Sequence, residues 1–348
     1  MTPPTMFVML TTLGLGTTTT FASSHWILAW MGLEISTLAI IPLMAQHHHP
    51  RAVEATTKYF LAQATAAALL MFAATSNAWT QGQWEVHQLN DPTAVNLAVT
   101  ALAMKMGIPP LHFWLPEVLQ GLDLTTGLIL STWQKMAPMA LMYQTAQGTT
   151  PYLMLSIGVA SALVGGWGGL NQTQLRKVMA YSSIAHMGWM MVIMKYSPNL
   201  MILSFSLYVI MTSSAFMALK AARSTKMNVL AMAWTKSPAL TGMTMMTVVS
   251  LAGLPPLTGF TPKWMILDEL TKQELPLIAT IMAMSALLSL FFYMRLSYSM
   301  TLTISPNTNT NKTSWRTDLR QGMMPLSIAM IASAMLLPIT PALMALAA

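Results

Sequence analysis

Titratable side chains inside long apolar segments are the residues of this sequence that could do chemistry. They are Glu34, Lys105, Lys135, His186 and Lys263, together with His112, which follows a pair of prolines. Burial favours the neutral form of a lysine, whereas a neighbouring carboxylate favours its charged form. A charge at the centre of a bilayer costs at least about 2.5 kcal/mol, so such residues usually face a bundle interior and mark paths for ions or protons. These residue types predict proton transfer within a membrane.

The composition indicates that the apolar segments cross a membrane. The chain has 348 residues, of which 54% are hydrophobic and 8% are charged, whereas about 25% of residues are charged in a soluble domain. Because a membrane-spanning helix needs about 20 mostly apolar residues, we predict an all-α polytopic membrane protein with about eleven transmembrane helices. The predicted spans are roughly 3–21, 25–46, 55–78, 93–115, 125–145, 151–170, 177–195, 200–221, 239–260, 276–300 and 323–346.

Within these spans the internal titratable residues share one depth. With a rise of 1.5 Å per residue, Glu34, Lys105, Lys135 and His186 lie roughly 14–18 Å from the start of their spans, about half of the hydrocarbon core. Lys263 should also be central, because it follows an interruption of its helix. The sequence thus predicts a row of titratable groups in the membrane plane. Two plainer interpretations remain open: the charges only set helix register, and the histidines only hydrogen-bond across helices.

Two of the predicted helices must be interrupted. Glycine and proline recur at matching positions 146 residues apart, with Gly107, Pro109 and Pro110 in the first copy and Gly253, Pro255 and Pro256 in the second. Proline removes a backbone donor and clashes with the preceding turn, and broken backbone inside a bilayer is tolerated only where it faces protein or water. We therefore predict broken helices at about 93–120 and 239–272. Paired breaks are typical of transporters built from internal repeats.

The spacing of the breaks predicts the domain organisation. An offset of 146 residues spans five helices, an odd number, so the second repeat must enter the membrane in the inverted orientation. We predict two inverted five-helix repeats, at 1–147 and 148–301, followed by a polar connection and one C-terminal transmembrane helix at 302–348. The alternative is that two proline-rich helices arose independently.

Cysteine content and charge exclude other classes of protein. The chain has no cysteine, which excludes disulfides, iron–sulfur ligation and thiolate zinc sites within it. A formal charge of +7 would suit nucleic acid, but the basic residues lie in short loops, mostly on one side, which is typical of membrane topology. We expect no nucleic-acid partner. The bias places the N-terminus on the matrix or cytoplasmic side and the C-terminus on the opposite side.

Motifs along the whole chain carry a family resemblance. They include Gly32-Leu33-Glu34, Lys105-Met106-Gly107, Ser182-Ser183-Ile184-Ala185-His186 and Leu254-Pro255-Pro256-Leu257-Thr258-Gly259-Phe260 with Pro262-Lys263-Trp264. With these motifs the chain resembles the antiporter-like membrane subunits of respiratory complex I, which are related to multi-subunit cation/proton antiporters. The resemblance implies proton-transfer roles for Glu34, Lys105, Lys135 and Lys263, and candidate relay roles for His112 and His186. That family typically has fourteen helices, so eleven here imply the loss of three at the N-terminus.

The resemblance also implies the location, cofactors and partners of the chain. It implies a location in the mitochondrial inner membrane, with the N-terminus in the matrix and the C-terminus in the intermembrane space. Proton translocation would be driven by electron transfer from NADH to ubiquinone in other subunits, which would bind the NADH, FMN, iron–sulfur clusters and ubiquinone, so we expect no cofactor in this chain. The implied partners are neighbouring antiporter-like subunits, small membrane-arm subunits, accessory subunits and structural phospholipids. A passive scaffold, a stand-alone sodium/proton antiporter and a quinone-reducing subunit are the alternatives.

The two repeats differ at one position that matters. Where the first repeat has Lys105, the second has Leu251, and the charge of the second repeat appears at Lys263, which aligns with Glu117. Lys105 has Glu34 as a candidate partner, whereas the sequence offers no internal carboxylate for Lys263. We therefore expect Lys105 to stay charged at rest and Lys263 to be the proton-releasing end of the row.

Overall fold

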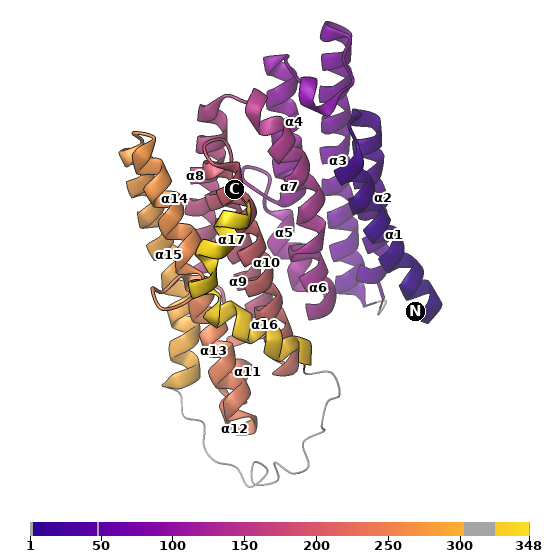
Figure 1. Ribbon diagram of the computed structural model, residues 1–348. Coiled ribbons are helices and arrows are strands. Elements are labelled where there is room, and N and C mark those ends of the chain that lie inside the picture. The colour runs from indigo at the N-terminus through magenta and orange to yellow at the C-terminus, as the bar shows by residue number, and fades with distance from the viewer. Residues whose placement is uncertain (1–2, 47–48, 303–323, 348) are drawn as a thin grey trace. The chain divides into compact units, whose positions relative to one another are not determined.

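The structure, a computed structural model, describes residues 3–46, 49–302 and 324–347 (Figure 1). These residues are almost entirely helical, and no β-strand element occurs among them. They group into two compact units, Met1–Ser161 and Ala162–Ala348. The all-α class predicted from the sequence is therefore correct for the described part of the chain.

The first unit contains seven α-helices and the beginning of an eighth. They are α1 (Pro3–Ala22), α2 (Trp26–Met44), α3 (Pro50–Gln81), α4 (Pro92–Met106), α5 (Trp114–Gly121), α6 (Leu124–Ser131), α7 (Trp133–Thr145) and α8 (Pro151–Gly169), with short 3₁₀ turns at Val86–Gln88 and Ala146–Gly148. Several helices begin with proline, whose fixed φ and missing donor suit the first turn of a helix. Asp91 caps α4 by accepting a hydrogen bond from the backbone N–H of Thr93.

Close packing fixes α2 between two neighbours in the first unit. A Cβ atom at Gly32 would lie 2.6 Å from Thr19 Oγ1, so only glycine lets α1 and α2 approach this closely. On the other side, the Trp30 indole of α2 donates a hydrogen bond of 3.2 Å to the Ala67 carbonyl of α3. These contacts hold the turn of α2 that carries Glu34.

The second unit contains the remaining helices. They are α9 (Leu175–Ile193), α10 (Pro198–Ala221), α11 (Met227–Ala231), α12 (Ala233–Lys236), α13 (Pro238–Ala252), α14 (Phe260–Lys272), α15 (Pro276–Thr301), α16 (Met324–Met335), a 3₁₀ turn at Leu337–Ile339 and α17 (Thr340–Ala347). α10 packs against α9, α13 and α16, and α13 also packs against α15 and α16. The broken pair α13 and α14 is thus surrounded by helices of its own unit.

Two predicted spans are wrong in detail because each is interrupted. The span predicted at 125–145 is divided between α6 and α7 at Thr132, and the C-terminal span predicted at 323–346 is divided between α16 and α17. Pro338 explains the second interruption, since it cannot donate a hydrogen bond to the preceding turn. Residues 303–323, which include most of the predicted polar connection, lie outside the described residues.

Several of the described helices have the length and composition of membrane spans. Five described helices are long and apolar enough to cross a membrane: Trp26–Met44, Pro50–Gln81, Pro151–Gly169, Pro198–Ala221 and Pro276–Thr301. Pro238–Ala252 and Met324–Met335 are shorter apolar helices. The count of eleven spans therefore stays a prediction, as does the inverted-repeat arrangement.

Candidate functional site

The first break ends α4 immediately after Lys105. Gly107 adopts φ +75°, a left-handed conformation that favours glycine, and its amide closes the last turn on the Met104 and Ala103 carbonyls. The Trp114 indole folds back across the break and donates a hydrogen bond of 3.1 Å to the Met104 carbonyl. The Gly-x-Pro-Pro segment therefore breaks the helix as predicted, and the aromatic side chain after it satisfies one of the carbonyls at the helix end.

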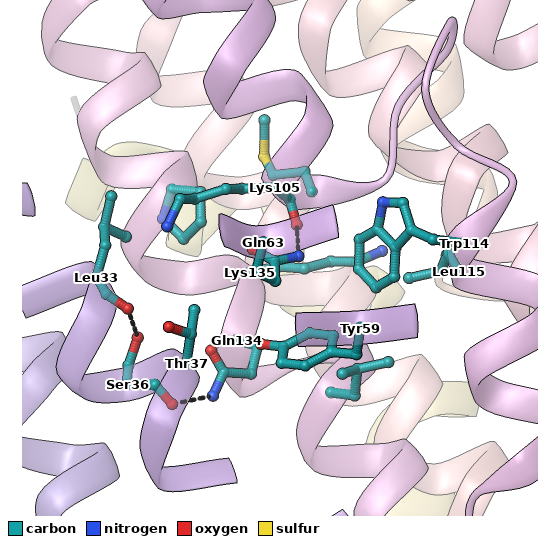
Figure 2. Close-up of a pocket in the computed structure, with 13 residues that line it drawn as sticks. Leu33, Ser36, Thr37, Tyr59, Gln63, Lys105, Trp114, Leu115, Gln134 and Lys135 are labelled. Carbon is teal, nitrogen blue, oxygen red and sulfur yellow. Dashed lines mark hydrogen bonds between the residues drawn. The ribbon is translucent and has the colours of Figure 1, made fainter. Parts of the chain in front are cut away.

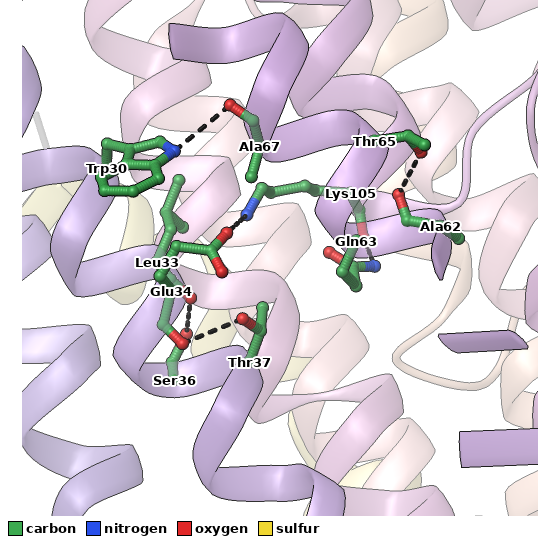
Figure 3. Close-up of polar contacts among 10 residues, drawn as sticks. All are labelled: Trp30, Leu33, Glu34, Ser36, Thr37, Ala62, Gln63, Thr65, Ala67 and Lys105. Carbon is green, nitrogen blue, oxygen red and sulfur yellow. Dashed lines mark hydrogen bonds and ion pairs between the residues drawn. The ribbon is translucent and has the colours of Figure 1, made fainter. Parts of the chain in front are cut away.

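Lys105 and Glu34 form an ion pair inside the first unit (Figure 3). Lys105 Nζ lies 3.4 Å from Glu34 Oε1, and the exposed fractions of the two side chains are 1% and 23%. The Gln63 amide donates a hydrogen bond of 3.3 Å to the Lys105 backbone carbonyl and so ties α3 to the end of α4. The contact expected between these two titratable residues is present.

A small cavity connects the surroundings of Lys105 with those of Lys135. Its lining residues include Tyr59, Gln63, Lys105, Gln134 and Lys135 (Figure 2), and its volume is about 10 Å³. A cavity needs about that much space to hold one water molecule, and this one combines a mostly apolar lining with the polar groups of these residues. In Figure 2 the ammonium groups of the two lysines point toward opposite sides of the pocket. A proton passing between them would therefore need a water molecule or a side-chain movement.

Lys135 lies on a short, irregular stretch of helix. Thr132, between α6 and α7, has φ −111° and ψ −69°, and its hydroxyl donates a hydrogen bond of 2.7 Å to the Leu128 carbonyl. Pro138, within α7, has no N–H to donate to the preceding turn. Lys135 itself is 2% exposed. The sequence predicted one continuous helix at 125–145 because neither glycine nor proline occurs at 129–135.

At the second break, Lys263 of α14 lies against the end of the preceding helix, α13. α13 ends at Ala252, and Gly253 follows with φ +83°. Lys263, in the first turn of α14, points back across the break and donates a hydrogen bond of 2.7 Å to the Ala252 carbonyl. A Cβ atom at Gly253 would lie 3.0 Å from Lys263 Nζ. The backbone conformation favours glycine here, and a larger residue would also displace the lysine beside it.

The two histidines lie in different units. His112 follows the first break in unit 1; its Nδ1 lies 3.3 Å from the Pro110 carbonyl oxygen, and 5% of the residue is exposed. His186 lies on α9 in unit 2, with its ring centroid 5.7 Å from that of Tyr208. Glu34, Lys105 and Lys135 belong to the first unit, and Lys263 to the second. A single row joining all of these residues therefore stays a prediction.

One charged cluster was not predicted as a contact. Lys58 Nζ lies 2.7 Å from both Glu54 Oε1 and Glu117 Oε2. In the predicted repeat alignment, Glu117 corresponds to Lys263. All three side chains are more than 40% exposed, so the ion pairs contribute little to stability. The i,i+4 spacing of Glu54 and Lys58 was a local signal, whereas the contact with Glu117 depends on the packing of α5 on α3.

Comparisons with known proteins agree with this architecture. A family model described as "NADH:quinone oxidoreductase/Mrp antiporter, TM" matches residues 23–289. A second, described as "NADH dehydrogenase subunit 2 C-terminus", matches residues 290–344. Together the two models account for nearly all of the chain.

Solved structures with low sequence identity share the fold. Respiratory complex I from Thermus thermophilus with bound aureothin contains a chain with a TM-score of 0.79 and 24% identity, over 96% of this chain and 79% of that one. The Mrp complex from Dietzia sp. contains one with a TM-score of 0.83 and 14% identity, over 97% and 76%. These similarities show the helical fold alone.

Curated relatives are far closer in sequence. NADH-ubiquinone oxidoreductase chain 2 of Carassius auratus is 63% identical over 346 residues, which is 99% of each chain. The protein of that name from Oncorhynchus mykiss is 62% identical over 348 residues, the full length of both. Identity at this level over the whole length shows that the chain belongs to the NADH-ubiquinone oxidoreductase chain 2 family, within the NADH:quinone oxidoreductase/Mrp antiporter membrane family.

Proposed function

We propose that this chain is a membrane subunit of respiratory complex I that translocates protons across the mitochondrial inner membrane. The curated relatives supply the name of the assembly. The observation that carries the proposal is the ion pair between the buried Lys105 and the partly exposed Glu34 at the end of a broken helix, beside a small cavity that Lys135 also lines. A buried lysine whose carboxylate partner is close by is suited to binding and releasing a proton.

The mechanism follows from the distance between the two members of the pair. While Glu34 is close, its charge favours the protonated form of Lys105, and when the carboxylate moves away, burial favours release of the proton. A water molecule in the cavity would carry that proton toward Lys135. Lys263 would be the terminal group, with His112 and His186 as relays. Electron transfer from NADH to ubiquinone, in other subunits that hold the FMN and iron–sulfur clusters, would drive the cycle.

The topology completes the proposal. Eleven spans, two inverted five-helix repeats at 1–147 and 148–301, and a C-terminal segment at 302–348 would place the N-terminus in the matrix and the C-terminus in the intermembrane space. The partners would be neighbouring antiporter-like subunits, small membrane-arm subunits, accessory subunits and structural phospholipids. Basic loops on the N-terminal side and paired breaks at Gly107 and Gly253 support this arrangement.

Replacement of Lys105 tests the proposal directly. Lys105→Met keeps the approximate volume of the side chain and removes the titratable group, so the complex should assemble but pump fewer protons per NADH oxidised. Electron transfer and proton pumping are scored separately in the assembled complex. Lys272→Met is the matched control, because Lys272 is 63% exposed and pairs only locally with Asp268. Normal pumping by the Lys105 variant would favour the passive scaffold instead.

A stand-alone cation/proton antiporter is the second candidate function. The matching family model favours it, because its description names the Mrp antiporter as well as the quinone oxidoreductase. The purified chain reconstituted in liposomes distinguishes the two functions. Sodium-dependent proton flux from this chain without any partner would support the antiporter, whereas no flux, together with pumping by the assembled complex, would support the complex I subunit.

A further inference from the structure

The C-terminal helix meets the second break through buried hydrogen bonds. α16 packs against α10 and α13 (Figure 1). The Ser250 hydroxyl, in the last turn of α13, donates a hydrogen bond of 2.6 Å to the Ser333 carbonyl of α16. The Thr258 hydroxyl, from the segment between α13 and α14, donates to the same carbonyl. One carbonyl oxygen thus joins both sides of the break.

The junction is fully buried and tightly packed. Ser250, Thr258 and Ser333 are each 0% exposed, and the two hydroxyl oxygens lie 3.1 Å apart. A Cβ atom at Gly259 would lie 1.8 Å from the Ser250 carbonyl oxygen, so the residue after Thr258 also lies directly against α13. The broken segment is therefore held to α13 on one side and to α16 on the other.

The Ser333 carbonyl accepts these bonds because of where α16 ends. Ser333 belongs to the last turn of α16, which ends at Met335, and the last four carbonyls of a helix have no partner within it. Pro338 cannot extend the helix. A buried carbonyl without a donor costs free energy, and Ser250 and Thr258 supply two donors. The hydroxyl groups at the second break thus supply the hydrogen bonds that the end of α16 lacks.

This junction lies two residues from the carbonyl that Lys263 contacts. Lys263 donates to Ala252, and Ser250 precedes Ala252 on the same final turn of α13. Any shift of that turn moves the acceptor of the lysine. Thr258 fixes the segment that leads into α14, which carries Lys263. Both ends of the Lys263–Ala252 hydrogen bond are therefore anchored to α16.

We propose that Ser250 and Thr258 are positioning residues, which clamp the second break to the Ser333 carbonyl of the C-terminal helix and so place Lys263 for proton transfer. The inference rests on the proposed function of Lys263. It assigns a role to the C-terminal helix, which lies outside the two predicted repeats. Neither hydroxyl takes up or releases a proton in this role.

Single substitutions in the assembled complex test the clamp. Ser250→Ala and Thr258→Val each remove one donor and should shift the equilibrium from the clamped to the released break by about twofold to tenfold, the range expected for one hydrogen bond. Each variant should therefore pump fewer protons per NADH oxidised. Thr258→Ser keeps the hydroxyl and should restore normal pumping. Because both hydroxyls serve one carbonyl, the double variant should lose less than the product of the two single effects.

Thr247→Val is the control on the same helix. Thr247 is 1% exposed, and among the described residues its hydroxyl bonds only to the Thr244 carbonyl of its own helix, so its loss should leave the pumping ratio unchanged. The clamp is overturned if the Ser250 and Thr258 variants pump like this control. The clamp is also overturned if the Ser250 and Thr258 variants assemble in smaller amounts but the assembled complex pumps normally. It is likewise overturned if these variants form no complex at all. In both cases the junction would be purely structural. Normal pumping by Lys105→Met would instead contradict the proposed function itself.

Discussion

Lys263 Nζ donates a hydrogen bond of 2.7 Å to the carbonyl of Ala252, the last residue of α13 before the second break. Lys105 lies on α4, just before the first break, and contacts the Glu34 carboxylate at 3.4 Å. A carbonyl carries only a partial charge, whereas a carboxylate carries a full one. The two lysines therefore have different partners, a carboxylate for Lys105 and a backbone carbonyl for Lys263. The sequence predicted such a difference, because Leu251 takes the place of Lys105 in the second copy of the motif.

Glu34→Gln should impair pumping without preventing assembly. Glutamine keeps the volume of glutamate and can still contact Lys105, but it removes the charge that favours the protonated lysine. Because Glu34 is 23% exposed, we expect an effect on stability of only about 1 kcal/mol. The measurement is proton pumping per NADH oxidised in the assembled complex. An unchanged ratio would mean that the pair only sets helix register.

Most helix boundaries could be predicted because local residues determine them. Proline starts several helices, and Gly107 and Gly253 end the broken ones with the positive φ that glycine tolerates. The interruption at Thr132 was missed because Trp133 and the apolar residues around it continue the hydrophobic pattern. The C-terminal span was predicted as one helix because its composition stays apolar on both sides of Pro338.

The candidate site was predictable only in part, for a physical reason. A buried charge is visible in the sequence because it is so unfavourable in an apolar segment, so Lys105, Lys135 and Lys263 stood out. Glu34 stood out for the same reason, but uncharged or exposed partners on other helices leave no such signal. The contacts of Lys58 with Glu117 and of Ser250 with Ser333 join residues 59 and 83 positions apart, and they depend on packing.

Gly253→Ala should disturb the second break at Lys263. Alanine at φ +83° is strained by about 1–2 kcal/mol, and its Cβ would lie 3.0 Å from Lys263 Nζ. We expect less stable complex and a lower pumping ratio in what remains. Gly242→Ala is the control on the same helix: nothing lies within 4 Å of its Cβ, so alanine should stabilise the helix by up to about 1 kcal/mol. Equal melting temperatures and pumping ratios for the two variants would refute the steric argument.

Protease protection tests the odd number of spans. In mitochondria stripped of their outer membrane, a tag at the N-terminus should be protected from added protease, and a tag at the C-terminus should be cleaved. The reason is that basic loops stay on the side of synthesis and eleven crossings leave the ends on opposite sides. Detergent-solubilised samples, in which both tags must be cleaved, provide the control. If both tags behave alike in intact membranes, the span count and the inverted repeats are wrong.

Replacing Lys105 or Lys263 by glutamate should distinguish the roles of the two lysines. Lys105→Glu places a second carboxylate beside Glu34, and two like charges at that distance disfavour each other's ionisation, so pumping should be lost. Lys263→Glu places a carboxyl group beside the Ala252 carbonyl, where its protonated form can still donate one hydrogen bond.

A carboxyl group at position 263 would remain titratable and beside its acceptor, so part of the pumping should survive. Lys263→Met, which can neither titrate nor donate, is the reference for complete loss. The measurement is protons pumped per NADH oxidised across a range of pH, for complexes assembled to the same level. If Lys263→Glu pumps no better than Lys263→Met, or if Lys105→Glu retains as much activity as Lys263→Glu, the two lysines do not have the separate roles that their different partners imply.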